Sequence, residues 1–233
     1  MYELAPSVYA ADYLEIKKQI KIMEEEGAKY LHLDIMDGHF VPGLSFGPAF
    51  VKALRSCTEM IFDVHLMVDF PGKYIHDFSA AGADIITVHV EADTKVTETL
   101  SLIHREGKKA GVVLKPSTPV ESIAAPVWQQ IDVIQIMTVE PGLRGQTFIP
   151  SSCEKIRKTR DIINEQLLKN PDRSIELEVD GDITPLNLRQ VLSAGANIIV
   201  AGKGLFLGDL TGNIRTYMDI IQNGGYDAVS NWS

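Results

Sequence analysis

The sequence predicts one α/β domain, a TIM (β/α)8 barrel, over residues 1–223. Short runs rich in Val, Ile and Leu alternate with helix-forming segments, the pattern of a parallel sheet covered by helices. The length of 233 residues is close to the roughly 250 residues of a typical barrel, and no linker rich in Pro, Gly and Ser divides the chain. A doubly wound open sheet is the alternative that shares this pattern.

The expected strands are apolar on both faces, as buried parallel strands are. They cover residues 2–8, 30–36, 61–68, 85–90, 109–115, 133–139, 174–180 and 197–202. Eight such strands alternating with helices favour a closed barrel.

Amphipathic or helix-forming segments lie between these strands. They include residues 12–26, 73–81, 95–106, 151–168 and 185–194. Asp12 and Ser151 are the expected N-caps, because their side-chain oxygens can accept a hydrogen bond from a free backbone N–H of the first turn. Pro185 suits a first helical turn, where its missing N–H costs nothing.

Three of the expected helices end with a Gly-Ala pair that begins at Gly27, Gly82 or Gly195. Glycine just past a helix can adopt the left-handed conformation that leads the chain into the next strand. We expect the last residues, 224–233, to form a frayed tail.

Composition excludes several classes of function. A formal net charge of −9 argues against a nucleic-acid partner, which needs a basic surface. No apolar run approaches the roughly 20 residues that span a bilayer, so no membrane partner is expected. Cys57 and Cys153 are too few for a disulfide framework and the first ten residues do not resemble a signal peptide, so a cytoplasmic setting is expected.

Polar side chains cluster where several expected strands end, which is where a barrel carries its active site. His32 and Asp34 are two residues apart and therefore share one face of a strand. His65 and Asp180 lie at or near the ends of two other strands. Each residue alone would suit a core or turn position. Together, two imidazoles and two carboxylates form a ligand set suited to Zn²⁺, Mn²⁺, Fe²⁺ or Co²⁺.

Four further residues occupy comparable positions. Ser7 lies at the end of the first strand, and Met36, Met67 and Met137 lie at the ends of three others. The methionines suit either a soft core filler or the wall of a site.

Five longer runs lie around the expected strand ends: Leu4–Ser7, Leu33–Pro42, Asp63–Met67, Gly82–Ala92 and Glu176–Gly181. Together they resemble the ribulose-phosphate 3-epimerase family, and the resemblance extends from residue 4 to about residue 207. It implies a barrel of the ribulose-phosphate-binding type that interconverts ribulose 5-phosphate and xylulose 5-phosphate around one divalent metal ion. It also implies a homo-oligomer, a dimer or a hexamer.

The resemblance further implies a role for each strand-end residue. The metal ligands would be His32, Asp34, His65 and Asp180, of which Asp34 and Asp180 would also be the catalytic acid/base pair. Substrate would contact Ser7, and the reacting centre would be lined by Met36, Met67 and Met137. Phosphate would lie against loops that carry Gly142, Gly145, Gly181 and Gly202. Apart from the resemblance, His89 at the end of the fourth strand is a weaker candidate, which would lie behind the ligands and support them.

The phosphate end departs from the family pattern. Where the family has Pro-Gly-Phe-Gly-Gly-Gln, this chain has Leu143 and Arg144 in place of Phe-Gly; Asp182 and Lys203 replace a Gly and a Ser, and Lys115 replaces an Asn. An unpaired carboxylate about 4 Å from a phosphate would cost roughly 4 kcal/mol at a surface-like dielectric.

Three arrangements of the altered end remain open. Lys203 can pair with Asp182 and still reach the phosphate, helped by Arg144. Alternatively, the pair can fill the phosphate pocket, in which case the substrate is unphosphorylated or longer. The side chains can also face solvent.

The leading interpretation is therefore an enzyme, an epimerase that inverts carbon 3 of a ketose phosphate, with ribulose 5-phosphate as the expected substrate. Allulose 6-phosphate, another hexulose phosphate or a free ketose is the alternative. A related decarboxylase would need an Asp-x-Lys-x-x-Asp motif that the strand at Asp34 lacks. A catalytically silent binding protein would not need two opposed carboxylates.

Overall fold

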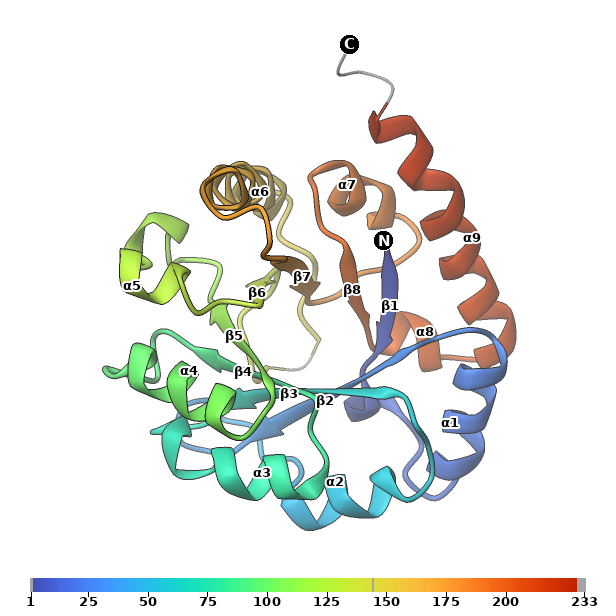
Figure 1. Ribbon diagram of the computed structural model, residues 1–233. Helices are drawn as coiled ribbons and strands as arrows, with labels where there is room; N and C mark the ends of the chain where they lie inside the picture. The colour runs from blue at the N-terminus through green and yellow to red at the C-terminus, as the bar shows by residue number, and fades with distance from the viewer. Residues whose placement is uncertain (1, 144, 230–233) are drawn as a thin grey trace.

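The protein folds into a barrel of eight parallel strands with helices outside it (Figure 1). The structure, a computed structural model, describes the backbone of residues 2–143 and 145–229 and the side chains of residues 2–143 and 145–223. From β2 to β8 each strand pairs with the next one in sequence, and β1 pairs with β8. A parallel bridge between Ser7 and His32 joins β1 to β2. The expected TIM barrel is confirmed.

Each observed strand lies within an expected one, with ends that differ by at most two residues. The strands are β1 (Glu3–Pro6), β2 (Tyr30–Met36), β3 (Ile61–Met67), β4 (Ile85–His89), β5 (Lys109–Leu114), β6 (Val133–Met137), β7 (Glu176–Asp180) and β8 (Ile198–Ala201). The agreement follows from their composition, since nearly every strand residue is buried.

The helices form the outer layer (Figure 1). They are α1 (Ile16–Glu25), α2 (Pro48–Arg55), α3 (Ile75–Ala81), α4 (Val96–Arg105), α5 (Ala125–Trp128), α6 (Ser152–Lys169), α7 (Leu188–Ser193), α8 (Lys203–Phe206) and α9 (Leu210–Val229). Three short 3-10 turns complete the described elements: η1 (Val8–Ala10), η2 (Pro71–Lys73) and η3 (Val120–Ser122).

Two of the expected helix starts are wrong. Asp12 does not cap α1, because its carboxylate accepts a hydrogen bond from the backbone N–H of Leu14 and closes a local turn before the helix begins. Pro185 precedes α7 by three residues, since the side chain of Asn187 accepts from the Thr184 N–H and delays the helix. Ser151 does occupy the N-cap position of α6, but its hydroxyl makes no capping hydrogen bond.

The expected glycine turns are confirmed. Gly27, Gly82 and Gly195 have φ angles of 89°, 108° and 108°. At Gly82 the backbone returns directly into the barrel, as the Ala83 N–H donates to the Phe78 carbonyl at 3.1 Å. A glycine at this position therefore ends α3 and starts the approach to β4.

The C-terminal segment continues as helix farther than expected. The backbone of α9 stays helical to Val229, within the range 224–233 that we expected to fray. Residues 230–233 lie outside the described part of the chain, so a frayed end there stays a prediction. No helix in the described residues is long and apolar enough to cross a membrane.

The barrel interior is layered. One inward-facing cluster is apolar and consists of Ala5, Tyr30, Ile85, Val133, Ile198 and Val200. Two residues farther along β2, β4 and β6, on the same face, come His32, Thr87 and Gln135, all fully buried. The apolar layer therefore supports a polar one, and the polar layer carries the candidate site.

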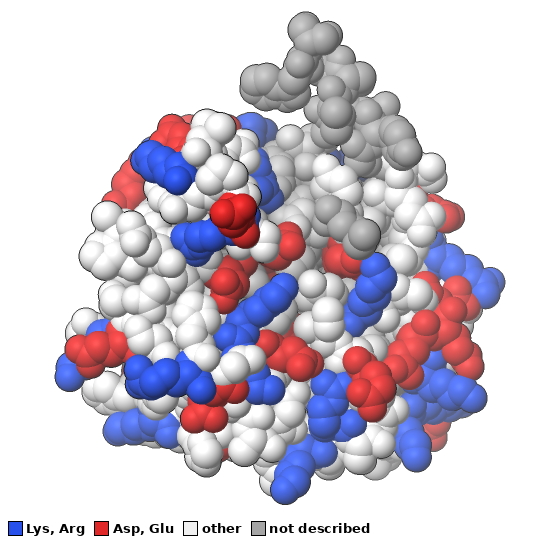
Figure 2. Space-filling view, in the orientation of Figure 1, with Lys and Arg blue, Asp and Glu red and all other residues white. Residues whose placement is uncertain are grey.

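Charge is mixed on the face shown in Figure 2, where Lys and Arg side chains alternate with Asp and Glu. The described side chains form no broad basic patch on this face, in keeping with the net charge of −9.

We expect Gly82→Ala to lower the free energy of unfolding by at least about 2 kcal/mol, since it adds a clash to left-handed strain of about 1–2 kcal/mol. A Cβ there would lie 2.6 Å from Cδ of Arg55, whose guanidinium is tied to Asp84. Gly107→Ala is the control, because Gly107 has φ 72° and its Cβ would meet nothing within 4 Å. Urea unfolding measures both; equal losses would contradict the clash.

Candidate active site

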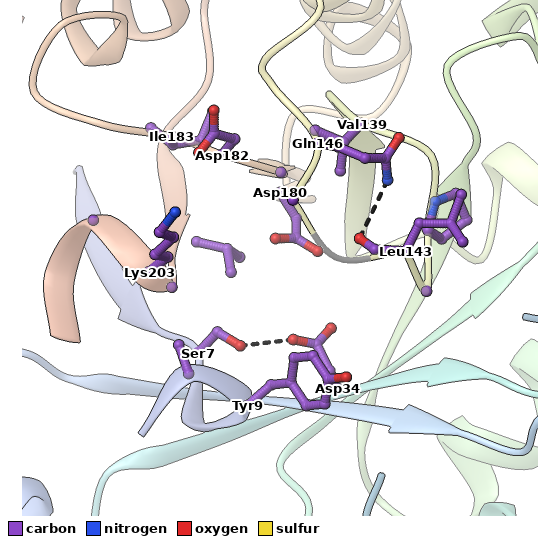
Figure 3. A pocket seen from close by; sticks show the side chains of 18 of the residues that line it. Ser7, Tyr9, Asp34, Val139, Leu143, Gln146, Asp180, Asp182, Ile183 and Lys203 are labelled. Atoms are coloured by element: carbon purple, nitrogen blue, oxygen red, sulfur yellow. Dashed lines mark hydrogen bonds between the residues drawn. The ribbon is translucent and has the colours of Figure 1, made fainter. Parts of the chain in front are cut away.

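A cavity of about 730 Å³ opens at the carboxyl ends of the strands. Its walls contain strand-end residues that the sequence singled out: Ser7, Asp34, Met36, Met67, Met137 and Asp180. Asp34 and Asp180 enter it from opposite sides and point toward one another (Figure 3). Residues from five strands thus meet in one place, although their roles stay predictions.

The four expected metal ligands lie together beside this cavity. One nitrogen or oxygen atom from each of His32, Asp34, His65 and Asp180 lies within 4.8 Å of the others. Oδ1 of Asp34 is 3.3 Å from Nε2 of His32 and 3.1 Å from Nδ1 of His65. Oδ2 of Asp180 is 3.9 Å and 3.8 Å from the same two nitrogens. Ligands about 2.1 Å from a tetrahedral ion lie about 3.4 Å apart, so these separations fit one cation.

The surroundings of His32 leave one ring nitrogen free. Its Nδ1 is 2.6 Å from Oδ2 of Asp63, and both side chains are fully buried. A hydrogen bond to that carboxylate places the proton on Nδ1. Nε2 is buried, has no hydrogen-bond partner and lies 3.3 Å from Oδ1 of Asp34, so the neutral ring would offer a lone pair there. In the metal-free protein, burial lowers the pKa of His32, but the charges of Asp34 and Asp63 outweigh it and hold the pKa above its usual value. A buried nitrogen without a hydrogen-bond partner is suited to coordinate a metal ion.

The second histidine is held in a similar way by a neighbouring amide. Nε2 of Gln135 lies 3.2 Å from Nδ1 of His65, while the Thr87 hydroxyl donates to Oε1 of Gln135. Since the amide NH₂ group only donates, Nδ1 of His65 is the acceptor and carries a lone pair. Two imidazole lone pairs and two carboxylates thus face one another, which a divalent cation would stabilise.

The two aspartates have unequal environments. Burial raises the pKa of Asp34, but the charges and hydrogen bonds of His32 and His65 outweigh it and hold the pKa well below its usual range. Burial, reinforced by the negative charge of Asp34, raises the pKa of Asp180 to about 6. Such divergence between neighbouring carboxyl groups is typical of acid/base pairs.

Hydrogen bonds from two serines fix Asp34. The hydroxyl of Ser7 donates to Oδ2 of Asp34 at 2.6 Å (Figure 3). The hydroxyl of Ser45 donates to the Asp34 backbone carbonyl at 2.6 Å and accepts from the Met36 N–H. The sequence analysis missed Ser45, and no local pattern marks it.

Two buried acids, Asp63 and Glu178, lie against the candidate ligand His32 on the side away from Asp34. All three side chains are fully buried. Burial and the charge of Asp63 raise the pKa of Glu178 well above its usual value, which favours its neutral form. The sequence analysis assigned no role to Asp63 or Glu178, although each stands two residues before an expected ligand, His65 or Asp180, and so shares its face of the strand.

The phosphate end lacks the ion pair on which two of the three open arrangements depend. Asp182 and Lys203 both line the cavity, but no ion pair between them occurs among the described residues. Instead, Oδ2 of Asp182 accepts a hydrogen bond from the Phe148 backbone N–H at 3.2 Å. The two proposed versions that depend on a Lys203–Asp182 pair are therefore wrong in this detail. Arg144 lies outside the described residues.

The remaining expected phosphate residues also line the cavity: Gly142, Gly145, Gly181 and Gly202. Lys115 does not; its ammonium lies 4.0 Å from the centre of the Phe40 ring. The positive charge of Lys115, which replaces an Asn of the family pattern, therefore does not enter the cavity.

The loop between β6 and α6 forms one wall of the cavity. A Cβ on Gly142, whose φ is 75°, would lie 2.3 Å from Cβ of Val41, so only glycine fits this contact with the loop after β2. The amide of Gln146 donates to the Glu140 and Leu143 carbonyls within the loop. Figure 3 shows Leu143 across the cavity from Lys203.

Comparison with known proteins identifies relatives over most of the chain. A family model described as the ribulose-phosphate 3 epimerase family matches residues 3–206. The ribulose-phosphate 3-epimerase of Synechocystis is 47% identical over 205 residues, which cover 87% of this chain and 86% of that protein. The enzyme of the same name from Bacillus subtilis is 42% identical over 206 residues, 88% of this chain and 93% of that protein.

Solved structures share the fold at low identity. KGPDC from Streptococcus mutans has a TM-score of 0.66 and 16% identity and is matched over 96% of this chain and 99% of its own. A 3-hexulose-6-phosphate synthase has a TM-score of 0.65 and 16% identity over 95% of this chain and 100% of its own. At this identity the likeness supports the barrel alone.

Proposed function

The chain belongs to the ribulose-phosphate 3-epimerase family and is an isomerase, and from this premise we propose that it inverts carbon 3 of D-ribulose 5-phosphate with the help of one divalent metal ion. The product would be D-xylulose 5-phosphate. The names of the relatives support the substrate. The opposed carboxylates of Asp34 and Asp180 carry the mechanism.

Inversion beside a ketone needs a proton to leave one face of the carbon and another to arrive at the opposite face. A single base on one side cannot do both. Asp34 and Asp180 enter the cavity from opposite sides, so a ketose held between them would meet one carboxyl group on each face (Figure 3). We infer that one removes the proton from carbon 3 and the other returns a proton, in exchanged roles for the reverse reaction.

The residues that would hold the metal ion are His32, Asp34, His65 and Asp180. Their nitrogen and oxygen atoms suit Zn²⁺, Mn²⁺, Fe²⁺ or Co²⁺. When bound, such an ion would act as a Lewis acid that stabilises negative charge on the ketone oxygen and its neighbouring hydroxyl.

The methionines support the proposal by their burial and position. Met36, Met67 and Met137 are at most 7% exposed and still line the cavity. Their thioethers would place an apolar surface beside the reacting carbon and exclude water there.

Lys203 favours a phosphorylated substrate. It lines the cavity without an ion pair among the described side chains, while the carboxylate of Asp182 is bound to the Phe148 N–H. The ammonium of Lys203 would therefore be free to contact a phosphate. A hexulose 6-phosphate such as allulose 6-phosphate is the second candidate. Asp182 and Lys203 line the part of the cavity proposed to hold the phosphate, and its position would depend on the length of the sugar chain. The homo-oligomer and the cytoplasmic setting stay predictions.

Removal of the metal tests the ligand set. Chelation is expected to abolish epimerisation, and Zn²⁺, Mn²⁺, Fe²⁺ or Co²⁺ should restore it. His65→Ala should lose the metal by elemental analysis, whereas His76→Ala on the exposed surface of α3 should keep it. Full turnover by a preparation shown to be metal-free would contradict the metal assignment.

Substitution of the two carboxylates tests the acid/base pair. Asp34→Asn and Asp180→Asn should each lower kcat by about 10²–10⁴-fold, the usual contribution of a positioned acid or base. Metal content must be measured in parallel, because either change also removes a ligand. Asp161→Asn, at an exposed position on α6, is the control and should leave kcat unchanged. Wild-type turnover in either site variant would exclude that carboxylate.

Lys203→Ser tests the phosphate end. Loss of one charged hydrogen bond, worth about 1.5–3 kcal/mol, should raise KM for ribulose 5-phosphate by roughly 10–100-fold. KM for a free ketose should stay the same, and Lys21→Ser on α1 should change neither value. An unchanged KM for the phosphorylated substrate in Lys203→Ser would show that this side chain faces solvent.

A further inference from the structure

A chain of three buried or half-buried side chains leads from the loop after β4 to the candidate metal ligands. Oε2 of Glu91 is 3.1 Å from Nδ1 of His89. Nε2 of His89 is in turn 2.9 Å from Nε2 of His65. Since the other nitrogen of His65 faces Asp34, the chain ends at the candidate cation site.

If both imidazoles are neutral, the three side chains can be hydrogen-bonded in only one order of donors and acceptors. An ionised Glu91 only accepts, so Nδ1 of His89 carries the proton. Nε2 of His89 is then an acceptor, and Nε2 of His65 must be the donor. Nδ1 of His65 is left with a lone pair, the same result that the Gln135 amide requires from the other side.

Without this chain, only the 3.2 Å contact with the Gln135 amide would oppose the other tautomer of His65. Its Nδ1 is 3.1 Å from Oδ1 of Asp34, a distance at which an Nδ1–H would donate to the carboxylate. That bond would place a proton where a cation must bind. Two hydrogen bonds therefore compete for the single proton of His65. The bond from Nε2 to His89 leaves the cation site open, whereas a bond from Nδ1 to Asp34 would block it.

We propose that Glu91 and His89 are positioning residues that hold His65 in its Nε2–H tautomer and so keep Nδ1 available to the metal ion. The inference rests on the metal site of the proposed function. Neither residue contacts the cavity, so their effect reaches the ion only through His65.

The chain is held rigidly at its outer end. Oε1 of Glu91 accepts from the Lys115 backbone N–H at 2.8 Å, which leaves Oε2 for His89. The ring of Phe40 lies against His89 with centroids 4.9 Å apart, and the Lys115 ammonium lies 4.0 Å from the centre of the Phe40 ring. His89 itself is fully buried, so no water competes for its nitrogens.

The two histidine ligands are thus oriented differently. Nδ1 of His32 bonds directly to a carboxylate, Asp63, and leaves Nε2 free. His65 reaches its carboxylate, Glu91, through a second imidazole and leaves Nδ1 free. A neutral imidazole between ligand and carboxylate makes the support of His65 sensitive to the loss of either His89 or Glu91.

The tautomer can be read directly in the metal-free protein. Long-range ¹H–¹⁵N correlation spectra at about pH 8 should show His65 protonated at Nε2 in the wild type. In His89→Leu the proton should move to Nδ1. In His89→Gln, whose side-chain oxygen can still accept, it should stay on Nε2. In Glu91→Ala both tautomers of His89 should appear.

Zn²⁺ affinity, measured by competition with a chromophoric chelator, gives the second readout. His89→Leu should weaken binding by about 10–100-fold, the usual effect of losing such a partner, and His89→Gln should recover most of it. His104→Leu is the matched control: it breaks another histidine–carboxylate pair, with Asp132, far from the ligands and should leave the affinity unchanged.

The outcomes distinguish the positioning role of Glu91 and His89 from the metal site itself. Wild-type His65 protonated at Nδ1 would overturn the positioning role without any variant, as would a His89→Leu protein with unchanged tautomer and affinity. A wild-type protein that shows the Nε2–H tautomer but binds no Zn²⁺, Mn²⁺, Fe²⁺ or Co²⁺ would instead overturn the metal site of the proposed function.

Discussion

The structure depends on holding four electron-pair donors against one another inside a barrel. Lone pairs on Nε2 of His32 and Nδ1 of His65 face the carboxylates of Asp34 and Asp180 at 3.1–3.9 Å. Such an arrangement is unfavourable unless a positive charge lies between the donors, because buried polar atoms need partners. The surrounding residues fix each ring, and a cation bound between the four side chains would complete the arrangement. Both imidazoles are accordingly held by a hydrogen bond on the far side of the ring.

The barrel supplies this rigidity because every second side chain of each strand points into its interior. Inward-facing positions alternate along each strand, so an apolar layer, a layer of buried acids and amides, and the layer of candidate ligands stack along the axis. The loops add what the strands cannot. Ser45 ties the loop after β2 to Asp34, and Gly142 packs the loop after β6 onto Val41. The candidate ligands thus rest on strands, while loops line the rest of the cavity.

Local patterns were enough to predict the strands, the glycine turns and the residues gathered at the strand ends. The two-residue spacing along the strands also places Asp63 and Glu178 on the same face as His65 and Asp180. No spacing rule, however, shows that a buried acid orients a histidine. Contacts between loops left no trace in the sequence. The carboxylate of Asp182 accepts a hydrogen bond from the Phe148 backbone N–H. Its pairing with Lys203, one of the arrangements that the charges left open, does not occur among the described side chains, because charge patterns in a sequence do not reveal which backbone donors lie near. The same limitation misplaced the start of α1, where a backbone N–H beside the Asp12 side chain was the stronger partner.

The central claim is that two carboxyl groups exchange protons with opposite faces of one carbon. The most direct test is epimerisation of ribulose 5-phosphate by the metal-loaded protein in D₂O, with the product followed by NMR. Proton transfer through Asp34 and Asp180 predicts that xylulose 5-phosphate gains deuterium at carbon 3 and at no other carbon. Product that keeps its original hydrogen at carbon 3 would contradict the account.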